Sequence, residues 1–155
     1  MRMKYLLFAS SALLAILLIV SCKKSNAPAV SRWTINNQSY TATSTGFITG
    51  TTHPLIAYDT ASNPQAQLQI MFGHTPASNG TYTVVSPFST TIDSVQCAIG
   101  FLTGQTSSPT ISAISQGGTV SVTISNGKVI ATFNHVSMET ASSNFTTLTG
   151  TLIQQ

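Results

Sequence analysis

Charged side chains are scarce in this chain, and basic ones are scarcest beyond its first segment. Charged residues make up 6% of the 155 residues. Four of the six Lys and Arg residues lie within residues 2–24, which leaves Arg32 and Lys128 for the rest of the chain. Nucleic-acid binding depends on clustered basic groups that neutralise phosphates. We therefore expect no nucleic-acid partner.

Residues that commonly perform catalysis or bind metals are also few. Beyond residue 22 the carboxylates and histidines are Asp59, Asp93, Glu139, His53, His74 and His135. The histidine spacing matches no metal motif, and neither a glycine-rich phosphate motif nor a Gly-x-Ser-x-Gly motif occurs. We therefore expect no metal, no cofactor and no catalytic residue. A glycosidase needs two carboxylates facing one substrate, so a hydrolase of envelope glycans that uses Asp59, Asp93 or Glu139 is the alternative.

The long apolar run at residues 5–20 follows the basic residues Arg2 and Lys4. It is shorter than the about 20 apolar residues that span a bilayer as a helix. Its length and its basic flank are typical of a secretory signal peptide. An uncleaved membrane anchor is the alternative at this point.

The run closes with Ile19-Val20-Ser21-Cys22, which resembles the lipobox of bacterial lipoproteins. The resemblance implies a signal peptide at residues 1–21, diacylglycerol on the thiol of Cys22, a tether at residues 22–31 and one domain at residues 32–155. Two or three acyl chains anchor a protein stably. Lys23, where retained lipoproteins carry Asp, implies the outer membrane, and the absence of acidic residues after Cys22 implies its periplasmic face. A chance cysteine after an ordinary signal peptide is the alternative.

The second cysteine, Cys97, has no intramolecular partner once Cys22 carries lipid. It alternates with Val95, Ile99 and Phe101, so all four side chains are predicted to share one buried face. A reactive thiolate needs a neighbouring cation or a helix N-terminus, and nothing local supplies either. We predict a buried structural thiol.

The mature chain is rich in Thr, Ser, Val and Ile, which favours strands over helices. Turn signals divide it into short segments, which predicts an all-β domain of about eight to ten strands, an antiparallel sandwich or squat barrel. The candidate segments are 33–35, 39–43, 46–49, 55–58, 66–72, 80–85, 94–102, 111–114, 119–125, 128–135 and 144–153. Residues 138–143 are predicted to form a single helical turn.

Asn126-Gly127 gives the strongest local signal, because this dipeptide is typical of a two-residue hairpin turn. The turn pairs residue 125 with residue 128 and places Val120 opposite Phe133. Val122, Ile124, Ala131 and Phe133 are then predicted to lie on one buried face. Trp33, Tyr40, Tyr58 and Tyr82 are predicted to be core aromatics rather than a sugar-stacking platform.

Both ends of the domain resemble small all-β lipoproteins of unknown function from Bacteroidota-type bacteria. The resembling segments are residues 21–24, 33–42, 118–124, 131–133 and 150–152. The resemblance implies an all-β lipoprotein and transfers no activity.

Asp59-Thr60-Ala61 and Asp93-Ser94-Val95 resemble the Asp-Ser/Thr-apolar sites of periplasmic O-glycosylation in such bacteria. Thr60 and Ser94 are therefore candidate glycosylation sites, and aspartates that cap turns are the alternative. Taken together, these features predict a non-enzymatic binding or structural lipoprotein of the cell envelope. Its partners are the membrane, through the lipid, and a glycan or envelope protein.

Overall fold

The computed structural model describes residues 29–155 except 50–52, 90 and 106, and that part is all-β. The predicted signal peptide, Cys22 and most of the tether lie outside the described residues. The strands are β1 (Arg32–Ile35), β2 (Gln38–Thr41), β3 (Ser44–Phe47), β4 (Pro54–Asp59), β5 (Ala66–Phe72), β6 (Gly80–Val85), β7 (Gln96–Thr103), β8 (Thr110–Gly117), β9 (Thr119–Ser125), β10 (Lys128–Thr140) and β11 (Phe145–Ile153). Within these described ranges no helix has the length and apolar character needed to cross a bilayer.

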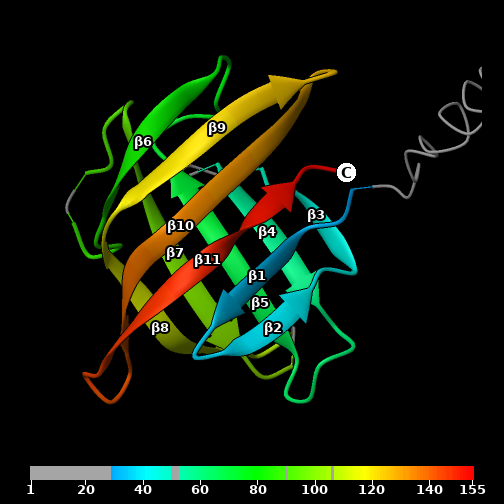
Figure 1. The fold of residues 1–155 in the computed structure, drawn as a ribbon, viewed down its shortest axis with the longest axis vertical. Helices are drawn as coiled ribbons and strands as arrows, with labels where there is room; N and C mark the ends of the chain where they lie inside the picture. The colour runs from blue at the N-terminus through cyan, green and yellow to red at the C-terminus, as the bar shows by residue number, and fades with distance from the viewer. Residues whose placement is uncertain (1–28, 50–52, 90, 106) are drawn as a thin grey trace, which may run out of the picture.

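The eleven strands form one sheet in the order β2-β1-β11-β10-β9-β6-β7-β5-β4-β3 (Figure 1). Strand β8 lies off this path and pairs with both β10 and β7. The partner of β10 therefore changes along its length, because β9 pairs with its first half and β8 with its last four residues. All pairs are antiparallel except β6 with β7, which is parallel and differs from the purely antiparallel prediction.

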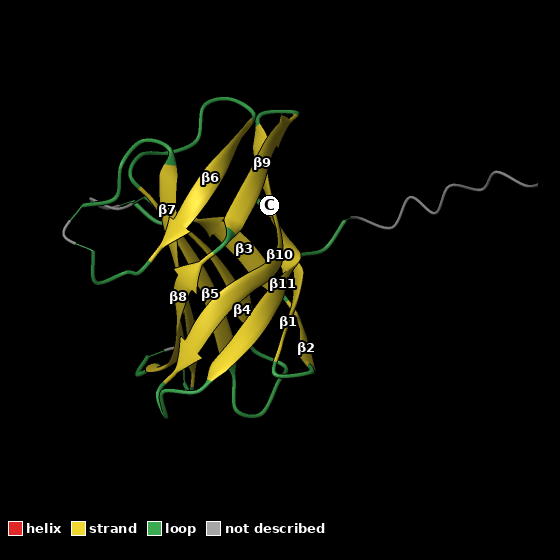
Figure 2. Ribbon diagram, turned by 60° about the vertical axis from the view of Figure 1, so that its left-hand side comes forward, coloured by secondary structure: helices red, strands yellow, loops and turns green. Residues whose placement is uncertain are grey.

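The two outermost strands of the path, β2 and β3, follow one another in the chain and join its ends. Between them Ala42 N donates to Ser31 O at 2.9 Å, and Thr43 N donates to Tyr58 O at 2.7 Å. Gln155 N also donates to Thr45 O at 3.0 Å. The sheet thereby curls into a rounded, barrel-like body (Figure 2), one of the two all-β forms predicted.

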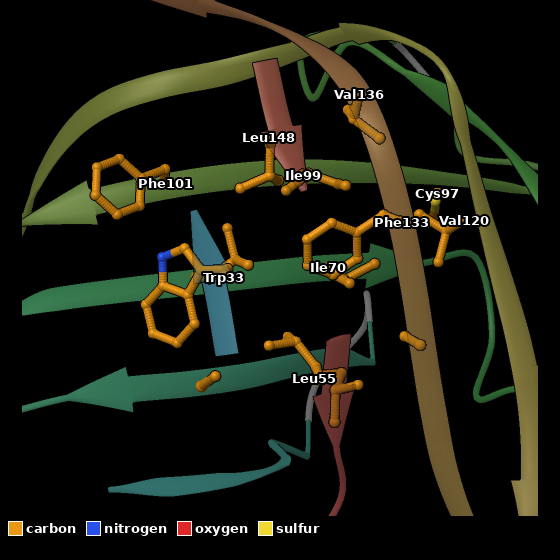
Figure 3. Close-up of a cluster of buried hydrophobic side chains, with 14 of the residues drawn as sticks. Trp33, Leu55, Ile70, Cys97, Ile99, Phe101, Val120, Phe133, Val136 and Leu148 are labelled. Atoms are coloured by element: carbon orange, nitrogen blue, oxygen red, sulfur yellow. The ribbon is translucent and has the colours of Figure 1, made fainter. Parts of the chain in front are cut away.

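Apolar side chains from most of the strands fill the interior (Figure 3). Trp33 stacks on Tyr40 with ring centroids 5.4 Å apart, and Tyr40 lies 5.3 Å from Phe101. Phe72 meets Tyr82 edge to face at 5.0 Å. These contacts confirm the core assignment of Trp33, Tyr40 and Tyr82, whereas Tyr58 is only half-buried.

The hairpin prediction is confirmed in detail. Ser125 pairs with Lys128 and Val120 with Phe133. Asn126 and Gly127 have φ of 51° and 73°, and a two-residue type I′ hairpin turn requires positive φ at both of its central residues. Val122, Ala131 and Phe133 are buried, and Ile124 is partly buried against the core.

Other boundaries need correction. Residues 138–143 form no helical turn, because Met138 is buried in β10, which continues to Thr140. Val95, predicted to face inward, is exposed. Ser31 belongs to the domain rather than the tether: it is buried, and its Oγ accepts a hydrogen bond from Ile153 N at 2.7 Å.

Candidate functional site

An open groove lies over β8 and holds about 460 Å³. Its lining residues are Phe88, Ile111, Ala113, Ile114, Gln116, Glu139, Thr140, Ala141 and Ser143. A second hollow shares Ile111, Thr140 and Ala141 with it and continues to Phe145. Phe88 is 76% exposed, Ile111 53% and Phe145 72%. Exposed apolar side chains that gather in one place mark interaction sites more often than scattered ones do.

The irregular pairing of β8 shapes the floor of this groove. Against β10, Ser137 pairs with Gly117 and Met138 with Ser115, so Gln116 has no partner on that side. A bulge of this kind redirects a side chain. Here Gln116 Nε2 donates to Glu139 Oε2 at 2.7 Å.

The connection between β6 and β7 brings Phe88 to the groove, and close backbone contact holds this connection in place. A Cβ on Gly73 would lie 2.4 Å from Ile92 O and 2.9 Å from Asp93 O, so only glycine fits under the connection. At its start, Phe88 N donates to Ser86 Oγ at 3.4 Å. The wall formed by Phe88 therefore depends on residues far from it in sequence.

Glu139 is the only ionisable residue among those lining the groove and the adjoining hollow. Its carboxylate accepts a hydrogen bond from the Gln116 amide. No basic side chain lines the groove or the adjoining hollow. The site therefore has a negative character within mostly apolar walls.

The three carboxylates predicted as an alternative catalytic set lie on different elements. Asp59 is buried at the end of β4 and accepts hydrogen bonds at 3.0 Å from the backbone N–H groups of Thr41, Ala61 and Ser62. Asp93 is exposed in the β6–β7 connection, and Glu139 lies in the groove. Asp59 thus caps the turn that follows β4, and Thr60 in that turn is exposed.

Both candidate glycosylation residues are exposed. The Asp59 cap fixes the turn that carries Thr60, whose hydroxyl lies 3.2 Å from Thr43 Oγ1. Ser94 lies in a turn before β7 rather than within the strand, so its hydroxyl is not covered by the sheet.

The histidines are dispersed as well. His53 precedes β4 and His74 follows β5, while His135 lies at a bulge of β10 with φ of 54° rather than at the strand end. Within the described ranges, no three His, Cys, Asp or Glu residues are grouped as metal ligands.

Cys97 is buried in β7, as predicted. Burial raises the pKa of its thiol to about 12. Because the thiolate is the reactive form, this thiol is inert at neutral pH.

Phe88, Ile111, Gln116 and Phe145 were not identified as site residues from the sequence. One available signal was Phe88, an apolar residue directly after Ser86-Pro87 in a loop with no alternating strand pattern. No family model, curated protein or solved structure matches this chain.

Proposed function

We propose that this protein is a lipid-anchored binding module of the cell envelope, held by Cys22 at the periplasmic face of the outer membrane, and that it binds its ligand in the groove over β8. One observation carries the binding part of the proposal. Of five strongly exposed large apolar side chains among the described residues, Phe88, Ile111 and Phe145 line this groove and the adjoining hollow.

Charge narrows the ligand class. Glu139 disfavours anionic ligands by like-charge repulsion, and no lining cation compensates for it. The ligand is therefore neutral or cationic. Exposed aromatic faces beside an amide and a carboxylate suit a neutral glycan or an apolar peptide segment with a basic residue.

The direction of β11 places the groove at the end of the domain opposite the anchored N-terminal segment, where a ligand can reach it. Ser31, where the chain enters the domain, bonds to Ile153 at one end of β11, whereas Phe145 lies at the other end. Eight residue steps of strand separate these ends by about 26 Å.

The arrangement of carboxylates gives no support to the hydrolase alternative. Asp59 already accepts hydrogen bonds from three backbone N–H groups. Asp93 and Glu139 lie on other elements. We therefore propose no catalytic role.

The anchor is tested by feeding cells a labelled fatty acid and comparing the full chain with Cys22→Ala. The parent protein should carry label and sediment with membranes, whereas the variant should lose both properties. Equal labelling of the two proteins would contradict the anchor without bearing on the groove.

The groove is tested by calorimetric titration of the detergent-extracted full chain with neutral envelope oligosaccharides and with apolar peptides bearing one lysine. Phe145→Ser should weaken the binding of whichever probe binds by at least about tenfold, roughly 1.4 kcal/mol. Val95→Ser is the matched control, because Val95 is exposed and apolar but does not line the groove. Equal losses in the two variants, or no binding of either probe, would contradict the proposed site.

A further inference from the structure

The sequence contains two Asn-Gly dipeptides, Asn79-Gly80 and Asn126-Gly127, and the fold holds them differently. Asn126 and Gly127 form the exposed tip of the β9–β10 hairpin. Asn79 and Gly80 lie at the start of β6, which pairs with β9 on the side away from β10. We propose that Asn126 is a site of spontaneous deamidation and that Asn79 is protected from it.

The reaction needs only the chain and water. The backbone nitrogen of Gly127 attacks Cγ of Asn126, a bond forms between them, and the bond from Cγ to Nδ2 breaks. The Nδ2 group takes the proton from the Gly127 nitrogen and leaves as ammonia, which closes a cyclic imide. Water then adds to one imide C–N bond and opens the ring to Asp or, through the other carbonyl, to isoaspartate.

The hairpin tip allows this attack. A Cβ built on Gly127 meets nothing within 4 Å, so there is open space beside this residue. No hydrogen bond holds the Asn126 side chain to any residue that the structure describes. Rotating Asn126 into the attacking geometry disturbs only the end of the ladder, and the end of a hairpin opens most readily.

Asn79 is restrained at both reacting groups. Its Oδ1 accepts a hydrogen bond from Ile124 N at 2.7 Å, which fixes the side-chain amide. Gly80 pairs with Val122 in the β6–β9 ladder, which fixes the attacking residue. The ladder must open before Cγ and the Gly80 nitrogen can meet.

A third asparagine provides a matched comparison for the turn itself. Asn36-Asn37 forms the β1–β2 turn with φ of 51° and 60°, close to the 51° and 73° of Asn126-Gly127. In this turn the second residue carries a side chain that obstructs attack on the first. We therefore expect little conversion at Asn36 despite the shared backbone geometry.

Conversion adds a carboxylate two residues before Lys128, in a chain where three Asp and Glu residues stand against six Lys and Arg. The isoaspartate product also adds one backbone atom to a two-residue turn. Aged protein should therefore contain a more acidic population whose hairpin end is loosened.

The test is to incubate the full-length, detergent-extracted protein at mildly alkaline pH and to measure Asp and isoaspartate at each position by peptide mapping. Asn126 should convert about five- to thirty-fold faster than Asn79, the difference that one or two broken native interactions impose. In urea the two Asn-Gly sites should convert at similar rates. Equal rates in the folded protein, or faster conversion at Asn79, would overturn the proposal.

Two exchanged variants complete the design. Gly127→Asn copies the β1–β2 turn and should slow conversion of residue 126 to the rate of Asn36. Asn37→Gly copies the hairpin tip and should make Asn36 labile. If neither exchange moves the rates, the local turn does not control the reaction and the proposal is wrong.

Discussion

The β9–β10 hairpin and the β6–β7–β8 region both contribute buried side chains to the same core, but they are held in different ways. In the hairpin, a two-residue turn sets six successive pairs, and the apolar faces alternate regularly. In the β6–β7–β8 region, a parallel pair and two bulged ladders meet at Ser115. Its buried hydroxyl accepts from Ile99 N at 2.9 Å and donates to Val85 O at 2.6 Å.

The difference shows which forces act in each region. Local turn chemistry and hydrophobic alternation suffice for the hairpin. The other region depends on one buried hydroxyl and on the close backbone contact at Gly73, both of which join residues distant in sequence. Substitutions can measure separately how much the local interactions and the contacts between distant residues stabilise the fold.

The largest effect is expected in the hairpin. Phe133→Ala removes a buried ring and should lower the free energy of unfolding by about 3–5 kcal/mol. Thr132→Ala, on the exposed face of the same strand, should change it by less than about 0.5 kcal/mol. Urea denaturation measures both, and a loss below about 1 kcal/mol for Phe133→Ala would mean that the buried face is wrongly assigned.

Ser115→Ala should have a smaller but clear effect on the β6–β7–β8 region. The substitution leaves the buried Ile99 N–H without its acceptor, which costs about 1–3 kcal/mol. Ser121→Ala on the exposed face of β9 is the control. Hydrogen exchange should increase at Ile99 first. Unchanged protection there would show that the hydroxyl does not hold the strands together.

Cys97 makes the same region sensitive to alkaline pH. Its folded pKa is raised by burial from 9.0 to about 12, so the folded protein retains a proton that the unfolded chain loses. The free energy of unfolding should therefore fall between about pH 9 and 12, by at most about 1.4 kcal/mol per pH unit from this group. Burial also raises the pKa of Tyr40 and Tyr82, which adds to the fall with the same sign.

Cys97→Ala isolates the thiol contribution. In this variant the alkaline decline should be shallower than in the parent protein, each compared with its own stability near neutral pH. Chemical denaturation at a series of pH values measures the two slopes. Parallel slopes would assign the whole decline to the tyrosines.

The smallest effect on folding is expected from glycosylation at Thr60 and Ser94. Both residues are exposed in turns, so a glycan would extend into solvent. Intact-protein mass spectrometry of the native protein should show mass beyond the lipidated polypeptide, and Thr60→Ala and Ser94→Ala should each remove part of it. A mass explained by lipid and polypeptide alone would reject both sites.

Sequence reasoning predicted the elements whose signals are local. The bounds of β5, β6 and β9 agree with the predicted segments, and the hairpin register follows from Asn126-Gly127. The bulge at Gln116 and the parallel pairing of β6 with β7 were not predictable in this way. Alternation identifies the buried face of a strand but not the strand beside it.

The candidate groove was missed for a related reason. Phe88 lies in the β6–β7 connection, Ile111 in β8, and Phe145 at the start of β11. Only the tertiary fold brings these three residues to one surface. The exposed position of Phe145 depends on where β11 begins, which composition does not reveal.

The junction between β2 and β3 bears on aggregation of this protein at high local concentration. Exposed strand edges template pairing between copies, and proteins commonly deter this with charged edge residues. A chain with 6% charged residues has few of them to use. Here the two outermost strands are consecutive, and the bend between them is held by hydrogen bonds from Ala42 N to Ser31 O, next to β1, and from Thr43 N to Tyr58 O in β4. We therefore expect connectivity, rather than charge, to hinder edge pairing between copies, and loosening the Ala42–Thr43 bend should promote fibril formation.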